Sequence, residues 1–190
     1  MTAVLKSVQL KDAADPVAEH VRAIIENLGE DVTRGGLAST PARYAKALRY
    51  LAGGYSGDVE SCIGNGVFPA EGESPVLMRD VQFYSLCEHH LLPFHGRIHV
   101  GYLPSRRIIG LSKIPRIVDL FARRFQVQER LTEQVADALV QALEPKGVVV
   151  VSEAQHLCMA MRGVQEHGAT TTVRATRGVC EPLLAMLQRS

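Results

Sequence analysis

The chain has 190 residues, of which 46% are hydrophobic and 22% charged, and its formal net charge is +1. This length suffices for one domain with a sizeable core, and no apolar run approaches the roughly 20 residues that cross a bilayer. The near-neutral charge excludes a general attraction to nucleic acid or to an anionic membrane. Residues 1–15 lack the continuous apolar stretch of a secretion signal, so we expect a cytoplasmic protein with reduced cysteines or cysteine metal ligands.

Helix signals dominate the first third of the chain. Asp15-Pro16 is typical of a helix start, and apolar residues then recur on one face until Gly29. Ser39-Thr40-Pro41 predicts a second helix, which Gly53-Gly54 would end. We therefore expect residues 1–70 to form an N-terminal helical segment.

The pattern changes to short β-type runs from residue 75 onward. Residues 76–78, 81–86 and 97–102 are rich in Val, Ile, Tyr and Phe, which predicts strands. A helical period returns between residues 115 and 143 and predicts two helices, and residues 148–161 and 170–176 predict two further strands. Strands and helices do not alternate strictly, which favours an α+β domain over residues 71–190, with an antiparallel sheet covered by helices on one face.

Two separated clusters of Cys and His residues predict a metal site. Cys87-Glu88-His89-His90 follows a predicted strand, and if the strand from Val148 continues, His156, Cys158 and Arg162 share one face. Cys87, Cys158 and one of the three histidines would leave a tetrahedral Zn²⁺ with an open position, as in catalytic zinc sites. The other two imidazoles would remain for proton transfer. A closed four-ligand site, or no metal, is the alternative.

The remaining histidines and cysteines do not suggest a second site. His95 and His99 are four apart in a predicted strand and thus roughly 13 Å apart, too far for one metal ion. We expect surface positions for His20 and His167. Cys62 and Cys180 have no His or Cys close in sequence and are expected to be inert thiols.

A group of cationic and hydroxyl side chains suggests an anionic ligand. Ser112, Lys113 and Arg116 lie near a predicted helix start and, with Arg162, suit a phosphate chain. The alternative is a solvated first helical turn. Glu129, in the first turn of the next helix, either complements the helix dipole or accepts hydrogen bonds from guanine N–H groups. Neither a P-loop nor a G-x-G-x-x-G sequence occurs.

From about residue 31 to residue 178 the chain resembles the GTP cyclohydrolase I family of zinc enzymes. Several ordered motifs carry the resemblance: Gly36-Leu37 with Thr40-Pro41-Ala42-Arg43, Cys87-Glu88-His89-His90 with Pro93-Phe94 and Gly96, Gly110-Leu111-Ser112-Lys113 with Arg116-Ile117-Val118, residues 126–132, and His156-Leu157-Cys158-Met159 with Arg162-Gly163-Val164. The chain departs from the family pattern at Arg34-Gly35-Gly36-Leu37 and after Gly178.

The resemblance implies a T-fold, a homodecamer with sites between subunits, and GTP as substrate. It implies that Cys87, His90 and Cys158 bind Zn²⁺ and that His89 and His156 act as acid and base. It further implies that Glu129 and Gln128 hold the guanine. The remaining substrate contacts that it implies are Ser112, Lys113, Arg116, Arg162, Arg43 and Glu88.

In the family, water attacks guanine C8, formate leaves, and rearrangement of the ribose gives 7,8-dihydroneopterin triphosphate, the start of tetrahydrofolate and pterin biosynthesis. Two other hypotheses stay open on the residues alone. One is a T-fold reductase of deazaguanine nitriles, which uses a thiol nucleophile and NADPH without this zinc set. The other is a zinc-stabilised binding protein that senses its ligand without turnover.

Overall fold

A computed structural model of the protein describes residues 15–188. The described chain divides into two compact units, one ending at Tyr50 and one beginning at Leu51. Most of the N-terminal stretch expected to lack a secretion signal lies outside the described residues. No helix within residues 15–188 has both the length and the apolar character that a membrane span requires.

The first unit contains the two helices predicted from their start signals, α1 (Pro16–Asn27) and α2 (Thr40–Leu51). The Asp15 side chain caps α1 by accepting a hydrogen bond from the Val17 amide at 3.0 Å. The same carboxylate binds Arg49 of α2, so one aspartate both starts the first helix and ties it to the second.

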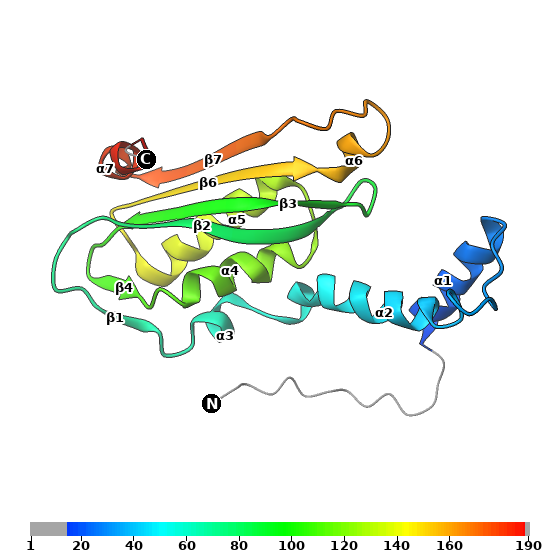
Figure 1. The fold of residues 1–190 in the computed structure, drawn as a ribbon. Helices are drawn as coiled ribbons and strands as arrows, with labels where there is room; N and C mark the ends of the chain where they lie inside the picture. Colours follow the sequence, from blue (N-terminus) through cyan, green and yellow to red (C-terminus); the bar gives the residue numbers. More distant parts are fainter. Residues whose placement is uncertain (1–14, 189–190) are drawn as a thin grey trace. The chain divides into compact units, whose positions relative to one another are not determined.

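The second unit is an α+β domain, which confirms the predicted class (Figure 1). Its five-stranded sheet has the order β5-β2-β3-β6-β7, and all pairs are antiparallel except the short β2–β5 pair. Its strands are β2 (Val76–Cys87), β3 (Pro93–Leu103), β5 (Phe125–Gln126), β6 (Gly147–His156) and β7 (Thr171–Gly178). A separate two-stranded sheet pairs β1 (Val67–Pro69) with β4 (Arg107–Ile109).

Helices α4 (Lys113–Ala122) and α5 (Gln128–Leu143) pack against the main sheet and enclose the core. The core contains fully buried side chains from both helices and from the central strands, among them Ile117, Leu131, Leu139, Phe83, Phe94 and Val150. Alternation along β3 and β6 places Phe94 and Val150 on the face of the sheet that the two helices cover. This packing fixes the start of α5 against the strands that carry the candidate site.

Several short elements of the second unit were not predicted from the sequence. These are η1 (Gly53–Ser56), α3 (Val59–Ile63), β1, β4, β5, α6 (Leu157–Ala160) and α7 (Glu181–Leu187). The first three lie in the part that sequence analysis assigned to the N-terminal segment, yet they belong to the second compact unit. Helix α7 packs Leu183 on Val149, which points away from the main core. Elements of two to seven residues give too few periods for a sequence pattern to reveal them.

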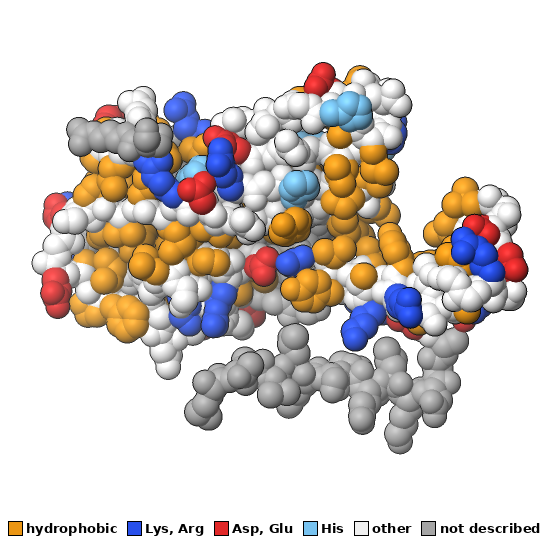
Figure 2. Space-filling view, viewed as in Figure 1, with side chains coloured by type: hydrophobic (Ala, Val, Ile, Leu, Met, Phe, Trp, Pro, Cys, Tyr) orange, Lys and Arg blue, Asp and Glu red, His pale blue; other side chains and the backbone are white. Residues whose placement is uncertain are grey.

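Charged side chains of both signs lie in small groups between wider hydrophobic and uncharged areas on the face shown in Figure 2. This distribution agrees with the net charge of +1.

Candidate metal centre and active site

A tight hairpin loop between β2 and β3 presents the first two candidate metal-ligating side chains. The Cys87 amide donates to the Leu92 carbonyl at 2.9 Å, and the Leu91 amide donates back to the Cys87 carbonyl at 2.8 Å. Leu91 adopts a φ of 54°, a conformation that is uncommon for a residue with a side chain. The loop therefore curls tightly enough for Cys87 and His90, three residues apart, to approach one point.

The ligand atoms of Cys87, His90 and Cys158 all lie within 4.8 Å of one another. Ligands at 2.0–2.3 Å from a tetrahedral ion are about 3.3–3.8 Å apart, so a small contraction would close this group on Zn²⁺. Two thiols and one imidazole are a donor set that zinc prefers. The convergence of Cys87 with Cys158 is as predicted, and His90 is the histidine that joins them.

The group has three members among the described residues. Cys87 is buried, Cys158 is half-buried and His90 is exposed. Burial raises the pKa of the Cys158 thiol, and the neighbouring Cys87 raises it further. A bound cation would reverse this preference, because a metal ligand must be the thiolate.

The predicted strand through residue 161 is wrong, although it led to the right cysteine. Strand β6 ends at His156, and Cys158 lies in the short helix α6. His156 pairs with Phe94 in the β3–β6 ladder, and Pro93 precedes Phe94 in β3. Since proline has no amide hydrogen, the β3–β6 ladder has no further donor there, and the chain turns into a helix. Cys158 thus reaches the cluster through a helical turn rather than through strand alternation.

His156 is held firmly between a ring and an amide. Its ring stacks on Phe94 with centroids 4.9 Å apart and planes at 4°, and its Nε2 is 2.9 Å from Gln128 Oε1. The β3–β6 pairing extends as far as the Phe94–His156 pair and so brings the two rings together. A side chain at Gly96 would collide with the Glu153 carbonyl, so glycine is required for the approach.

The Gln128 amide determines which nitrogen of His156 carries hydrogen. Gln128 Nε2 lies 3.1 Å from the Ser152 carbonyl and 2.9 Å from the Thr171 carbonyl, and both of these oxygens can only accept. Gln128 Oε1 therefore faces the ring, and His156 Nε2 donates to it. In the neutral ring, Nδ1 keeps the lone pair that a base needs. Burial lowers the pKa of His156, and the charge of Glu129 opposes that shift.

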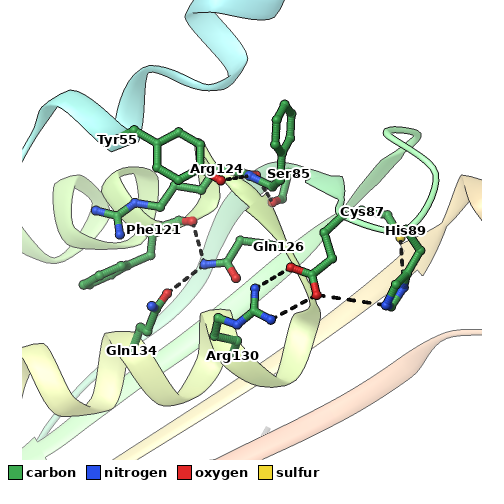
Figure 3. A network of polar contacts seen from close by, with 11 residues as sticks. Tyr55, Ser85, Cys87, His89, Phe121, Arg124, Gln126, Arg130 and Gln134 are labelled. Carbon is green, nitrogen blue, oxygen red and sulfur yellow. Dashed lines mark hydrogen bonds and ion pairs between the residues drawn. The ribbon is translucent and has the colours of Figure 1, made fainter.

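His89 lies beside the three-member group without belonging to it. Its Nδ1 is 3.8 Å from Cys87 Sγ and its Nε2 is 4.0 Å from a Glu88 oxygen (Figure 3). The side chain is 64% exposed. The ring therefore combines closeness to the metal ligands with access to solvent or substrate.

The first turn of α5 supplies three consecutive residues to this end of the sheet. Gln128 is buried and its side chain is engaged by protein groups, so it positions His156 rather than facing solvent. Glu129 is exposed and close enough to His156 for its charge to act there. Arg130, which sequence analysis missed, donates two hydrogen bonds to Glu88 at 2.5 and 3.0 Å. The position of Arg130 directly after Gln128-Glu129 was the sequence feature that could have pointed to a role at the site.

One chain does not bring the predicted phosphate-binding group to the metal ligands. Ser112, at the N-cap of α4, makes no side-chain cap bond, and Arg116 is exposed. Helix α4 follows β4, whose Ile109 amide donates to the Tyr102 hydroxyl near the far end of β3. Tyr102 lies eight residues from Phe94 in β3, so that end and the Phe94–His156 end are about 27 Å apart along the strand.

The other two predicted substrate-binding arginines differ in position. Arg162 is exposed just after α6, and its charge acts on the Cys158 thiol. Arg43 is exposed on α2, in the first compact unit. His20 and His167 are exposed as predicted, and the Cys180 thiol is buried and donates to the Val148 carbonyl.

A group of three candidate metal ligands, with the His89 imidazole beside it and His156 two residues before Cys158, on an α+β scaffold, fits an enzyme that uses one metal ion and transfers protons. Comparisons with known proteins agree. The model of the GTP cyclohydrolase I family matches residues 17–186. The chain belongs to the GTP cyclohydrolase I family and is an enzyme of that family.

Three curated relatives illustrate the similarity. GTP cyclohydrolase 1 of Deinococcus radiodurans is 53% identical over 92% of this chain and 81% of its own length. The Campylobacter jejuni protein of the same name is 52% identical over 84% of both chains. GTP cyclohydrolase 1 of Methylococcus capsulatus is 53% identical over 82% of this chain and 84% of its own length.

Proposed function

We propose that the protein hydrolyses GTP at guanine C8, releases C8 as formate and forms 7,8-dihydroneopterin triphosphate. One water opens the imidazole ring, a second releases formate, and one is lost when the new ring closes on the ribose-derived carbon. The net reaction thus consumes one GTP and one water. We place this reaction at the start of tetrahydrofolate and pterin biosynthesis. The observation that carries the proposal is the convergence of Cys87, His90 and Cys158 beside the imidazole of His89, with His156 two residues before Cys158 in the chain.

Cys87, His90 and Cys158 would hold Zn²⁺, because the donor set and the spacing of the ligand atoms fit that ion. When bound there, Zn²⁺ would supply a Lewis acid that makes water nucleophilic near neutral pH. The half-buried position of Cys158 limits access from one side, while exposed His90 leaves the group open on the other.

His89 and His156 transfer the protons in this proposal. His156 Nδ1, with its lone pair exposed by the fixed Gln128 amide, accepts a proton from the attacking water. His89 donates a proton to the guanine imidazole nitrogen as the water attacks, which makes C8 more electrophilic. The solvent access of His89 allows its proton to be replaced between turnovers.

Glu129 accepts hydrogen bonds from the N–H edge of the guanine, since its carboxylate is exposed close to His156. Arg162 contacts the triphosphate from the segment after α6. Ser112, Lys113, Arg116 and Arg43 contribute phosphate contacts from a second copy of the chain, because one copy carries the first three far from its own metal ligands. This separation supports a homo-oligomer with sites between subunits. A T-fold decamer is the assembly that we propose.

Incubation of the purified full chain with GTP tests the function. We expect equimolar formate and a fluorescent pterin after oxidation of the product, loss of both on treatment with a zinc chelator, and recovery with Zn²⁺. Replacement Glu129→Gln should lower kcat/KM by about tenfold, because one acceptor oxygen becomes a donor. Binding of GTP without formate would instead indicate a sensor, and consumption of NADPH with a nitrile substrate would indicate a reductase.

A further inference from the structure

The loop that carries Cys87 and His90 has few backbone ties to the rest of the domain. Apart from the hydrogen bonds that close the hairpin, the Glu88 amide donates to the Gln126 carbonyl of β5 at 2.9 Å. The side chains of His89, His90 and Leu91 are exposed. Beyond this backbone tie to β5, the Glu88 side chain links the loop to α5 itself.

Glu88 and Arg130 form a two-pronged ion pair between the loop and the first turn of α5. The guanidinium NH1 and NH2 groups donate to the two carboxylate oxygens at 2.5 and 3.0 Å (Figure 3). One of those oxygens is also 4.0 Å from His89 Nε2. Arg130 is two residues beyond Gln128, which orients His156. The first turn of α5 is therefore linked to His156 through Gln128 and to His89 through the Arg130–Glu88 pair.

The pair is placed to fix orientation rather than to stabilise the fold. Glu88 is 33% and Arg130 46% exposed, and ion pairs at such exposure contribute roughly 0–1 kcal/mol to folding. Two parallel N–H···O bonds nevertheless hold a carboxylate in one plane and one direction. The loop thereby acquires a fixed distance from α5 at little cost or gain in overall stability.

We propose that Arg130 is a positioning residue for the metal centre. Through Glu88 it holds the loop so that Cys87 and His90 stay opposite Cys158 and His89 stays beside them. This inference rests on the proposed function and assigns Glu88 to Arg130 rather than to the substrate, since both of its carboxylate oxygens are already engaged. Arg130 does not itself contact a reacting atom.

The test uses the zinc-loaded full chain with the replacement Arg130→Gln. Zinc release to a chromophoric chelator should become about tenfold faster, because loss of a residue that orients metal ligands costs about 10–100-fold in metal affinity or activity. The kcat for GTP should fall about tenfold while KM stays within about twofold. Arg130→Lys, which keeps the charge but loses the two-pronged geometry, should give intermediate values.

A matched control is Arg97→Gln, which breaks the similarly exposed Arg97–Glu153 pair on the sheet. The control should leave zinc release and kcat unchanged, and thermal unfolding midpoints should agree among the variants within about 2 °C. Glu88→Gln, which attacks the pair from the other side, should reproduce the effects of Arg130→Gln and serves in its place if that variant does not fold.

Wild-type zinc release and kcat in both Arg130→Gln and Glu88→Gln would overturn the inference. So would a rise in KM alone, which would mean that these side chains contact the substrate. The zinc-release measurement requires no turnover, so it decides the inference even if the wild-type protein produces no formate. That latter result would contradict the proposed function alone.

Discussion

The two ends of the main sheet differ in how completely one chain assembles them. At the end where β2 and β6 finish, His156, Gln128, Ser152 and Thr171 are linked by hydrogen bonds, and Glu88 is paired with Arg130. At the start of α4, Ser112 leaves its cap bond unmade and Arg116 is exposed. The first end is organised before a substrate arrives, whereas the second presents groups that a phosphate chain would engage. In the proposed function, chemistry and most of the phosphate contacts are thus separated along the sheet of one chain, with Arg162 as the phosphate contact at the metal end.

The largest expected effect comes from breaking the metal group itself. Cys158→Ser should abolish zinc binding at micromolar metal and lower turnover by more than about 1,000-fold, because a hydroxyl is a far poorer zinc ligand than a thiolate. Metal content and formate release measure the two effects. Cys62→Ser is the matched control, since Cys62 is also a half-buried thiol but lies outside the group. Retained zinc in Cys158→Ser would remove that residue from the ligand set.

His156→Ala should separate proton transfer from metal binding. The variant should keep its zinc while kcat falls about 100- to 10,000-fold, the usual contribution of a positioned acid or base. His95→Ala is the control, because His95 belongs to the same sheet and stacks on Tyr84 at 5.6 Å, but as the neighbour of Phe94 in β3 it lies on the opposite face of the sheet from Phe94 and His156. Full turnover in His156→Ala would contradict the role proposed for this ring.

The sequence predicted the metal ligands more securely than the path that brings them together. Cys87-x-x-His90 and a distant Cys158 were visible as residue types, and the α+β class followed from the change of period near residue 75. The helical turn at Cys158 was missed because the effect of Pro93 on a neighbouring strand depends on register, which a single sequence does not contain. For the same reason Gln128 was expected to face a ligand, whereas the fold buries it against β6 and β7.

Gln128→Leu should test whether the organised end depends on the buried amide. The loss of hydrogen bonds to Ser152 and Thr171 should destabilise the protein by about 1–3 kcal/mol, measured by denaturant unfolding, and kcat should fall about tenfold as His156 loses its fixed orientation. Gln126→Leu removes an equally buried amide that binds the Phe121 carbonyl and not His156. That control should lose stability while its kcat stays near the wild-type value. Equal losses of kcat in the two variants would mean that general destabilisation, not ring orientation, causes the effect.

Lys113→Ala should have the smallest effect and should affect binding rather than chemistry. Lys113 lies in the first turn of α4, where its ammonium adds to the positive end of the helix dipole. Losing one phosphate contact should raise KM for GTP about tenfold and leave kcat and zinc content within about twofold, because the metal group is built elsewhere in the chain. Lys146→Ala is the control, since Lys146 pairs with Glu73 on the surface and no phosphate role is proposed for it. A fall in kcat with unchanged KM would show that the start of α4 takes part in the reaction step, and the separation of chemistry from anion binding would then be wrong.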